Sequence, residues 1–182
     1  MGKRSHLARE IIETLVLTIL IFLVVQFAVQ NFRVDGISME PGLHNNEFVL
    51  VNKLAYDFHP PQRGDVIVFH YPLNPQEDFI KRIIGLPGDT IKVTPTQIYV
   101  DGHLLNEPYI SHPYNANVNT WHLGPGQYFV MGDNRPESYD SRYWGPVPAS
   151  YIIGKAALVY WPLNNIEFVP TYSTVYAAVT QK

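Results

Sequence analysis

The chain has 182 residues, of which 46% are apolar and 16% charged, and its formal net charge is −3. This length suits one domain with an appendage, and the acidic balance argues against a nucleic-acid binder, which needs a basic surface to neutralise phosphates. Because the chain has no cysteine, disulfides, thiolate catalysis and cysteine metal sites are excluded.

A membrane-length apolar run lies near the N-terminus. Residues 1–10 are rich in basic side chains, and 15 of the 20 residues from Ile11 to Gln30 are apolar, with Glu13 as the one charge. A helix of about 20 such residues crosses the hydrocarbon core of a bilayer. A cleavable signal peptide and a buried core helix are the alternatives. The run is longer than a usual signal-peptide core, no A-x-A motif follows it, and its apolar residues occupy every helix face.

These features predict four segments. Residues 1–10 form a basic N-terminus that stays in the cytoplasm, because positive charge before a span is retained there. Residues 11–30 form the transmembrane anchor. Residues 31–170 form a domain on the extracytoplasmic side of the cell membrane, and residues 171–182 form a C-terminal tail without a functional signal.

Short strands dominate the predicted domain. Apolar or β-branched runs bounded by Gly, Pro or Asn predict strands at 47–51, 65–69, 79–84, 127–131 and 154–160. The pair Asp101-Gly102 predicts a type I′ hairpin over 97–106. A short helix or turn is expected at 141–144, and the polar residues 106–123 indicate a long loop. The domain is therefore predicted to be mainly β.

Two residues suggest a hydrolase. Ser38 lies eight residues beyond the apolar run, and Lys81 lies on a predicted strand with Phe79 and Ile83 on the same face. A serine hydroxyl needs a base, and a lysine amine can be that base only when uncharged. Burial beside apolar side chains lowers the pKa of lysine and favours the neutral amine. For each residue alone the alternatives are a loop serine without a function and an edge-strand lysine that reaches solvent.

A dense polar segment, residues 132–145, lies between two glycines after a predicted strand. Its acids and arginines can pair with one another, and one of its serines can orient a neutral amine. A solvated loop is the alternative, but this concentration of charged and hydroxyl groups exceeds what an ordinary loop needs. The residues concerned are Asp133, Arg135, Ser138, Asp140 and Arg142.

Together these segments resemble bacterial-type signal peptidase I, also called leader peptidase. The matching stretches follow the family's order and comprise Ser38-Met39-Glu40-Pro41 and residues 63–69, 81–89 and 132–142. The resemblance extends from the anchor to about Tyr160. It implies an antiparallel β-sheet catalytic domain on a single N-terminal transmembrane helix, with the active site close to the bilayer.

The resemblance also implies individual roles. Ser38 matches the nucleophile, Lys81 the general base, and Ser138 the residue that hydrogen-bonds to this lysine and positions it. Two supporting ion pairs are implied, Asp140 with Arg142 and Asp133 with Arg82.

The substrate side of the site departs from the family pattern. Met39 matches the residue after the nucleophile, which lies near the substrate pocket. Gly36 stands where some members have a serine whose hydroxyl completes the oxyanion hole. This hole is therefore expected to depend on the backbone N–H of Ser38 and a second donor. Gly42 and Glu137 replace a common threonine and asparagine, and neither change removes a catalytic group.

The implied activity is that of a membrane-bound serine endopeptidase that removes N-terminal signal peptides from exported preproteins. The substrate would bind as an extended strand beside a sheet edge, with small residues before the cut. The expected partners are secretory preproteins and the lipid bilayer. No cofactor, metal, nucleic acid or nucleotide is expected, because the sequence contains neither an H-E-x-x-H motif nor a G-x-x-x-x-G-K loop.

Two other classes remain open. One is a non-catalytic membrane-anchored β domain that binds peptides, and the presence of both Ser38 and Lys81 disfavours it. The other is a self-cleaving Ser/Lys protease of the repressor type. The membrane span disfavours that class, as does the lack of an evident DNA-binding domain.

Overall fold

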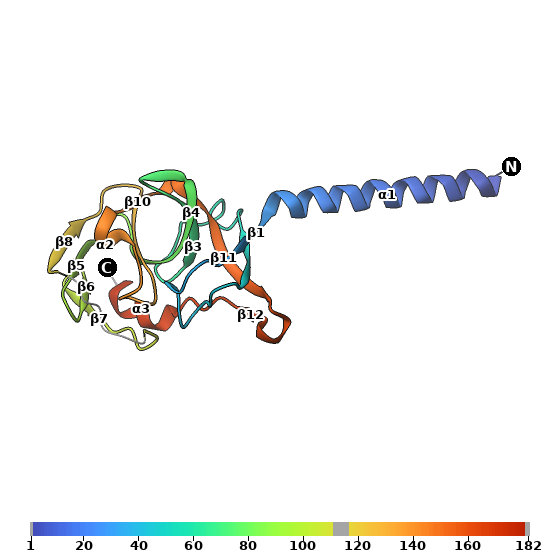
Figure 1. Cartoon of the computed structure of the whole chain (residues 1–182). Coiled ribbons are helices and arrows are strands. Elements are labelled where there is room, and N and C mark those ends of the chain that lie inside the picture. The colour runs from blue at the N-terminus through green and yellow to red at the C-terminus, as the bar shows by residue number, and fades with distance from the viewer. Residues whose placement is uncertain (1, 111–116, 181–182) are drawn as a thin grey trace.

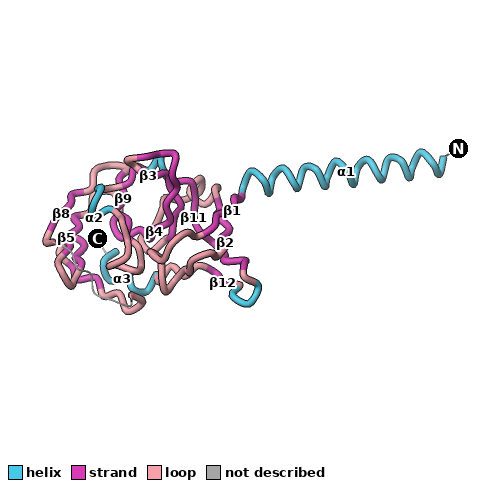
Figure 2. Tube along the Cα trace, viewed as in Figure 1, coloured by secondary structure: helices cyan, strands magenta, loops and turns pink. Residues whose placement is uncertain are grey.

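The computed structural model describes residues 2–110 and 117–180, which form a long helix joined to a β domain (Figures 1 and 2). The helix, α1 (Gly2–Ala28), extends away from the domain. Its segment Arg9–Ala28 has a mean hydropathy of 2.5, and 0% of this segment is buried against the rest of the chain. By length and composition this segment can cross a membrane. The helix ends two residues before the predicted anchor does, because Val29 and Gln30 pair with Asn52 and Val51 in a sheet.

The larger sheet has eight antiparallel strands. Their order is β1-β2-β11-β3-β4-β9-β10, and β12 pairs with β11 beside this path. The mainly β, antiparallel fold that the sequence predicts is confirmed, and the five predicted strands correspond to β2, β3, β4, β9 and β11. The bounds are β1 (Val29–Arg33), β2 (Phe48–Asn52), β3 (Val66–Tyr71), β4 (Asn74–Gly85), β9 (Gln127–Met131), β10 (Val147–Pro148), β11 (Ile152–Trp161) and β12 (Glu167–Phe168).

A smaller sheet of four strands lies at the end of the domain away from α1 (Figure 1). Its order is β7-β6-β5-β8, with β5 (Thr90–Val93), β6 (Ile98–Val100), β7 (His103–Leu105) and β8 (Asn119–His122). Asp101 and Gly102 have φ values of 50° and 82°, which confirms the predicted hairpin turn.

Strand β8 lies inside the segment that the sequence predicts as a loop, of which residues 111–116 fall outside the described part of the chain. Its Trp121 packs on Phe129 with ring centroids 4.8 Å apart. Polar residues dominate this strand, so the apolar contact and the pairing with β5 account for its formation.

Short helices connect the later strands. The predicted helix at 141–144 is confirmed as α2 (Ser141–Trp144), and the Asp140 carboxylate accepts a hydrogen bond from the Arg142 N–H at its first turn. Two short 3-10 helices, η1 (Ala149–Tyr151) and η2 (Leu163–Asn165), flank β11.

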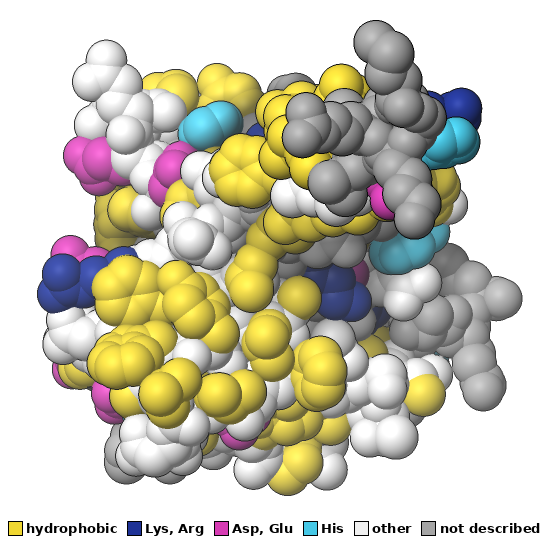
Figure 3. All heavy atoms as spheres, turned by 90° about the vertical axis from the view of Figure 1, so that its right-hand side faces the viewer, with side chains coloured by type: hydrophobic (Ala, Val, Ile, Leu, Met, Phe, Trp, Pro, Cys, Tyr) yellow, Lys and Arg dark blue, Asp and Glu magenta, His cyan; other side chains and the backbone are white. Residues whose placement is uncertain are grey.

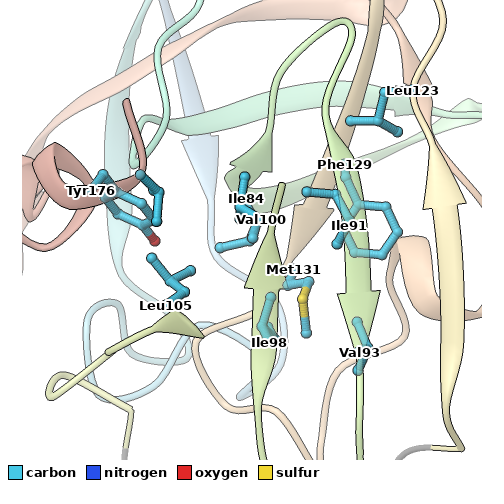
Figure 4. Close-up of a cluster of buried hydrophobic side chains, with 11 residues drawn as sticks. Ile84, Ile91, Val93, Ile98, Val100, Leu105, Leu123, Phe129, Met131 and Tyr176 are labelled. Carbon is cyan, nitrogen blue, oxygen red and sulfur yellow. The ribbon is translucent and has the colours of Figure 1, made fainter. Parts of the chain in front are cut away.

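Part of the segment 171–182, which the sequence predicts as a C-terminal tail, packs against the core, and residues 181 and 182 lie outside the described part of the chain. Helix α3 (Ser173–Thr180) buries Tyr176 and Val179, which are 2% and 5% exposed. Figure 4 shows Tyr176 in a cluster of apolar side chains with Leu105 and Ile84. The sequence did not reveal this packing because the apolar face of so short a helix gives a weak signal.

One face of the domain is apolar although it is exposed. The segment from the end of β11 through η2 to β12 carries Trp161, Leu163, Ile166 and Phe168, all between 49% and 82% exposed. This segment lies on the side of the domain from which α1 emerges (Figure 1), and hydrophobic side chains gather on that side (Figure 3). Such a patch is typical of a surface that contacts a membrane or another protein.

If α3 belongs to the core, Tyr176→Ala lowers the free energy of unfolding by about 3–5 kcal/mol, as expected for a large buried ring. Phe168→Ala is the control, because Phe168 is 82% exposed and its loss changes stability by only about 0.5 kcal/mol. Chemical denaturation of the detergent-solubilised chain measures both variants. Equal stability of the two would show that α3 does not contribute to the core.

Candidate active site

The loop that carries Ser38 is fixed from both sides. The Asn134 N–H donates to the Ser38 carbonyl at 3.0 Å, and the Asn134 side-chain amide donates to the Ile37 carbonyl at 3.2 Å. On the other side Met39 is fully buried in a cluster with Val34 and Leu43. The Ser38 side chain is thereby held half-exposed above the core.

Lys81 lies on β4 opposite Ile67 of β3 and is 5% exposed. Its Nζ atom is 2.7 Å from Ser38 Oγ and 2.9 Å from the Ile80 carbonyl oxygen. The ring of Phe79, expected on the same face of the strand, lies with its centroid 5.5 Å from Nζ. Two residues 43 positions apart in the sequence are therefore in hydrogen-bonding contact.

The surroundings of Lys81 favour its neutral form. The pKa of Lys81 is lowered from 10.5 to about 8, mainly by burial and to a smaller extent by the positive charge of Arg142. The negative charges of Asp140 and Asp133 act in the opposite direction. At pH 8 about half of the amines are thus unprotonated. A neutral amine at this distance can accept the proton of the Ser38 hydroxyl.

Ser138 lies beside this pair, but its hydrogen bonds differ from the predicted ones. Its buried hydroxyl donates to Asp140 Oδ2 at 2.7 Å and accepts the Gly132 N–H at 3.2 Å. Among the described residues, Lys81 donates only to Ser38 and Ile80, so the predicted bond between Ser138 and Lys81 is not formed. The carboxylate is the stronger acceptor for the single hydroxyl hydrogen.

Both predicted ion pairs are present and buried. Arg142 donates to both carboxylate oxygens of Asp140 at 2.8 and 2.9 Å, and also to the carbonyls of Arg135 and Ser138. Arg82 contacts both oxygens of Asp133 at 2.8 and 2.7 Å. Attraction to Asp133 raises the pKa of Arg82 although burial opposes this. These pairs fix the polar segment 132–142 next to β4.

Arg135 has a partner that the sequence does not reveal. The sequence suggests pairing within the polar segment, but Arg135 contacts both carboxylate oxygens of Glu107 at 2.6 and 2.7 Å. Both side chains are almost fully buried. Glu107 has no local sequence feature that marks it, so only the three-dimensional fold identifies this pair.

A groove of about 600 Å³ contains the exposed parts of the site. One wall is the segment 32–38, which comprises the end of β1 and the loop after it, and the other is the segment 77–81 of β4, so Ser38 and Lys81 come from opposite walls. Tyr139 and Glu137 of the polar segment also line it. Met39 is not part of this lining, because its side chain is fully buried in the cluster with Val34 and Leu43. Its place near the substrate pocket stays a prediction.

Gly36 lines the groove with φ at 91°, a conformation that favours glycine. Its N–H donates to Asn45 Oδ1 at 3.0 Å and is therefore occupied. The Ser38 N–H makes no hydrogen bond within the described part of the chain. This leaves it free to bind an oxyanion.

Within the described residues, no three His, Cys, Asp or Glu side chains are grouped in a way that could hold a metal ion.

Gly132 permits the close approach of three site elements. A Cβ atom there would lie 2.3 Å from the Ser38 carbonyl oxygen and 2.4 Å from Ser138 Oγ. Gly132→Ala must therefore displace the Ser38 loop, and we expect the implied peptide hydrolysis to fall by about 10²-fold or more. Gly124→Ala is the matched control, because its new methyl group meets only the flexible end of Gln127 at 3.2 Å. Full activity of Gly132→Ala in a preprotein cleavage assay would contradict this account.

Comparisons with known proteins identify the family to which the chain belongs. A family model described as "Signal peptidase, peptidase S26" matches residues 8–161. Signal peptidase I of Leptolyngbya laminosa is 40% identical over 163 residues, which cover 85% of this chain and 80% of the relative. Signal peptidase I of Bacillus caldolyticus is 40% identical over 157 residues, which cover 78% and 85%. The crystal structure of a signal peptidase I from Enterococcus faecalis V583 is 37% identical, with a TM-score of 0.46, and covers 52% of this chain and 95% of that one. The chain belongs to the signal peptidase family, peptidase S26.

Proposed function

We propose that Ser38 is the nucleophile and Lys81 the general base with which this signal peptidase, a serine endopeptidase, removes signal peptides from preproteins. The observation that carries the assignment is the 2.7 Å distance between Lys81 Nζ and Ser38 Oγ. It is supported by the burial of the lysine, which lowers its pKa so that about half of the amines are neutral at pH 8.

The proposed reaction has two steps. In the first, Ser38 Oγ attacks the scissile carbonyl carbon while its proton moves to Lys81 Nζ, and the resulting ammonium gives that proton to the leaving amine. In the second, Lys81 takes a proton from a water molecule that attacks the acyl-enzyme, and Ser38 is restored. The negative oxygen formed in each step is stabilised by the Ser38 N–H and a further donor.

Ser138, Asp140, Arg142, Asp133 and Arg82 are supporting residues in this proposal. They do not contact the reacting atoms. Their bonds hold the polar segment against β4, and the Asn134 in this segment in turn holds the Ser38 loop. The two acids also set the pKa of Lys81, because their charges oppose the effect of burial.

The preprotein is proposed to bind as an extended strand in the groove between segments 32–38 and 77–81. Backbone groups along these walls can pair with a peptide, as in other cases where a peptide adds a strand to a sheet. Small residues before the cut are proposed from the family resemblance. The Gly36 side of the groove and the apolar rings of Phe32 and Phe79 limit the shape of the side chains that fit.

The protein is membrane-anchored through α1, and we propose that its N-terminus is cytoplasmic and its catalytic domain extracytoplasmic. The support is the group of basic residues before the span. Single cysteines introduced at Ser5 and Asn119 test this, since the chain has no cysteine of its own. A membrane-impermeant thiol reagent applied to intact cells should label only position 119, and labelling of position 5 alone would reverse the assignment.

The pH dependence of cleavage tests the base. Because Lys81 acts only when unprotonated, kcat/KM should rise with pH and level off above an apparent pKa of about 8. Ser38→Ala, Lys81→Ala and Lys81→Arg should each lower the rate by about 10⁴-fold, the arginine because it stays protonated. Lys92→Ala, an exposed lysine on β5, is the control. Substantial activity in Lys81→Arg would refute the assignment.

Stability provides a second test that does not use catalysis. The unfolded chain holds the Lys81 proton up to pH 10.5, whereas the folded chain holds it only up to about 8. Burial of this lysine therefore lowers the free energy of unfolding, and this destabilisation has its full size below pH 8. It disappears as the pH rises to 10.5. Lys81→Met should stabilise the fold by about 3 kcal/mol at pH 7 and hardly at all at pH 10.5. A gain that is the same at both pH values, or no gain, would contradict the lowered pKa.

A further inference from the structure

A second hollow lies behind the wall of the groove formed by residues 32–38, at the end of strands β2 and β11, where Trp161 pairs with Phe48. Its volume is about 470 Å³. One wall is the turn before β2 and the other is the turn containing η2. We call it the amide pocket, since four of its lining side chains are carboxamides. The residues used below are Asn45, Asn46, Glu47, Trp161, Asn164 and Asn165.

The two walls of the amide pocket are joined by a buried acid. Glu47 is 3% exposed, and its carboxylate accepts the His44 N–H at 2.9 Å and a short hydrogen bond from the Asn165 side-chain amide. This acid links the turn before β2 to η2. The pocket therefore has a fixed shape before any ligand enters it, which lowers the entropic cost of binding.

The carboxamides offer both donors and acceptors to a ligand. The Asn45 and Asn46 oxygens accept hydrogen bonds from the Gly36 N–H and from Arg33. Their NH₂ groups make no hydrogen bond within the described residues. Asn165 uses its NH₂ group on Glu47, which leaves its oxygen as an acceptor. Asn164 is exposed, so both of its groups are available.

The charge of the pocket selects against an anion. Its lining contains no lysine or arginine, and its buried charge is the Glu47 carboxylate; the neighbouring Arg33 lies outside the lining and donates to the Asn46 oxygen. His44, also in the lining, lies 3.7 Å from another acid, Glu40. A phosphate would therefore lack the cationic partners that bind it strongly. A ligand with several neutral hydroxyl groups fits better, because each hydroxyl both donates and accepts.

Trp161 adds an aromatic surface. It is 49% exposed and lines the same hollow, so its ring can pack against the apolar C–H face of a sugar ring while the amides bind the hydroxyls. The combination of carboxamides, an aromatic ring and no cation is suited to a neutral sugar.

The position of the pocket points to the source of this sugar. Leu163, Ile166 and Phe168 in the same segment expose large apolar side chains, on the side from which α1 leaves the domain (Figures 1 and 3). Tryptophan beside such residues is typical of the level of lipid head groups. We propose that the amide pocket binds the neutral sugar head group of a membrane glycolipid. This inference does not depend on the Ser38–Lys81 assignment.

Native mass spectrometry of the detergent-solubilised full chain tests the proposal. A galactosyl diacylglycerol, phosphatidylcholine and phosphatidylglycerol are added separately at equal concentration, and methyl galactoside serves as a free sugar. We expect at least about tenfold tighter binding of the glycolipid than of either phospholipid or the free sugar. Equal binding of glycolipid and phosphatidylcholine would show that the surface recognises only acyl chains. Preference for phosphatidylglycerol, or equal affinity for the free sugar, would also overturn the proposal.

Variants localise the binding. Trp161→Ala and Asn164→Ala should each remove most of the preference for the glycolipid, and Asn164 is an exposed residue whose replacement leaves the fold intact. Phe168→Ala and Asn119→Ala are matched controls, one from the same apolar segment and one from the smaller sheet, and both should keep the preference. Unchanged binding by Asn164→Ala and Trp161→Ala would exclude the amide pocket. Preprotein cleavage by every variant is measured in parallel, so that loss of lipid binding is distinguished from loss of catalysis.

Discussion

The site depends on keeping one amine uncharged while it is surrounded by acids. Burial lowers the pKa of Lys81, but Asp140 and Asp133 would attract its proton back. Each acid is paired with an arginine that holds its charge, Arg142 and Arg82 respectively. Buried ion pairs contribute little net stability, because desolvation offsets their attraction. We infer that these pairs fix the polar segment in place. In each pair the positive charge of the arginine also compensates the negative charge of the acid near Lys81.

The sequence predicts those parts of the fold whose signal is local. Strands β2 and β3 and the second half of β4 are largely apolar or β-branched runs, and the turn at Asp101-Gly102 needs the positive φ values that it has. Strand β8 and helix α3 are different, because their formation depends on partners far away in the chain. Trp121 packs on Phe129, and Tyr176 packs among side chains from both sheets. No property of the local sequence reports these contacts.

The same distinction applies to the site. A lysine with apolar same-face neighbours and a loop serine close to the anchor are each weak signals, so Lys81 and Ser38 were assigned their roles through the resemblance to signal peptidase I. The bond expected from Ser138 to Lys81 is absent because Asp140, two residues away, accepts the hydroxyl hydrogen instead. Such competition between acceptors is decided by distances of tenths of an ångström. Arg135 likewise pairs with Glu107 and not with an acid closer in the sequence. The fold brings the Glu107 carboxylate to the two terminal nitrogens of the arginine.

Strand β4 connects the site to the end of the chain. Lys81 contacts Ser38, and its neighbour Arg82 points to the opposite face. There Arg82 donates to the Pro170 carbonyl at 2.6 Å and lies 4.7 Å from the Tyr172 ring centroid, in a segment beyond the residues 8–161 that the family model matches. Lys81 and Arg82 are adjacent in β4, so the C-terminal segment contacts this strand one residue from the amine. The position of Lys81 relative to Ser38 is therefore expected to depend on both ends of the domain, because Ser38 follows β1 and the C-terminal segment contacts the strand that carries Lys81.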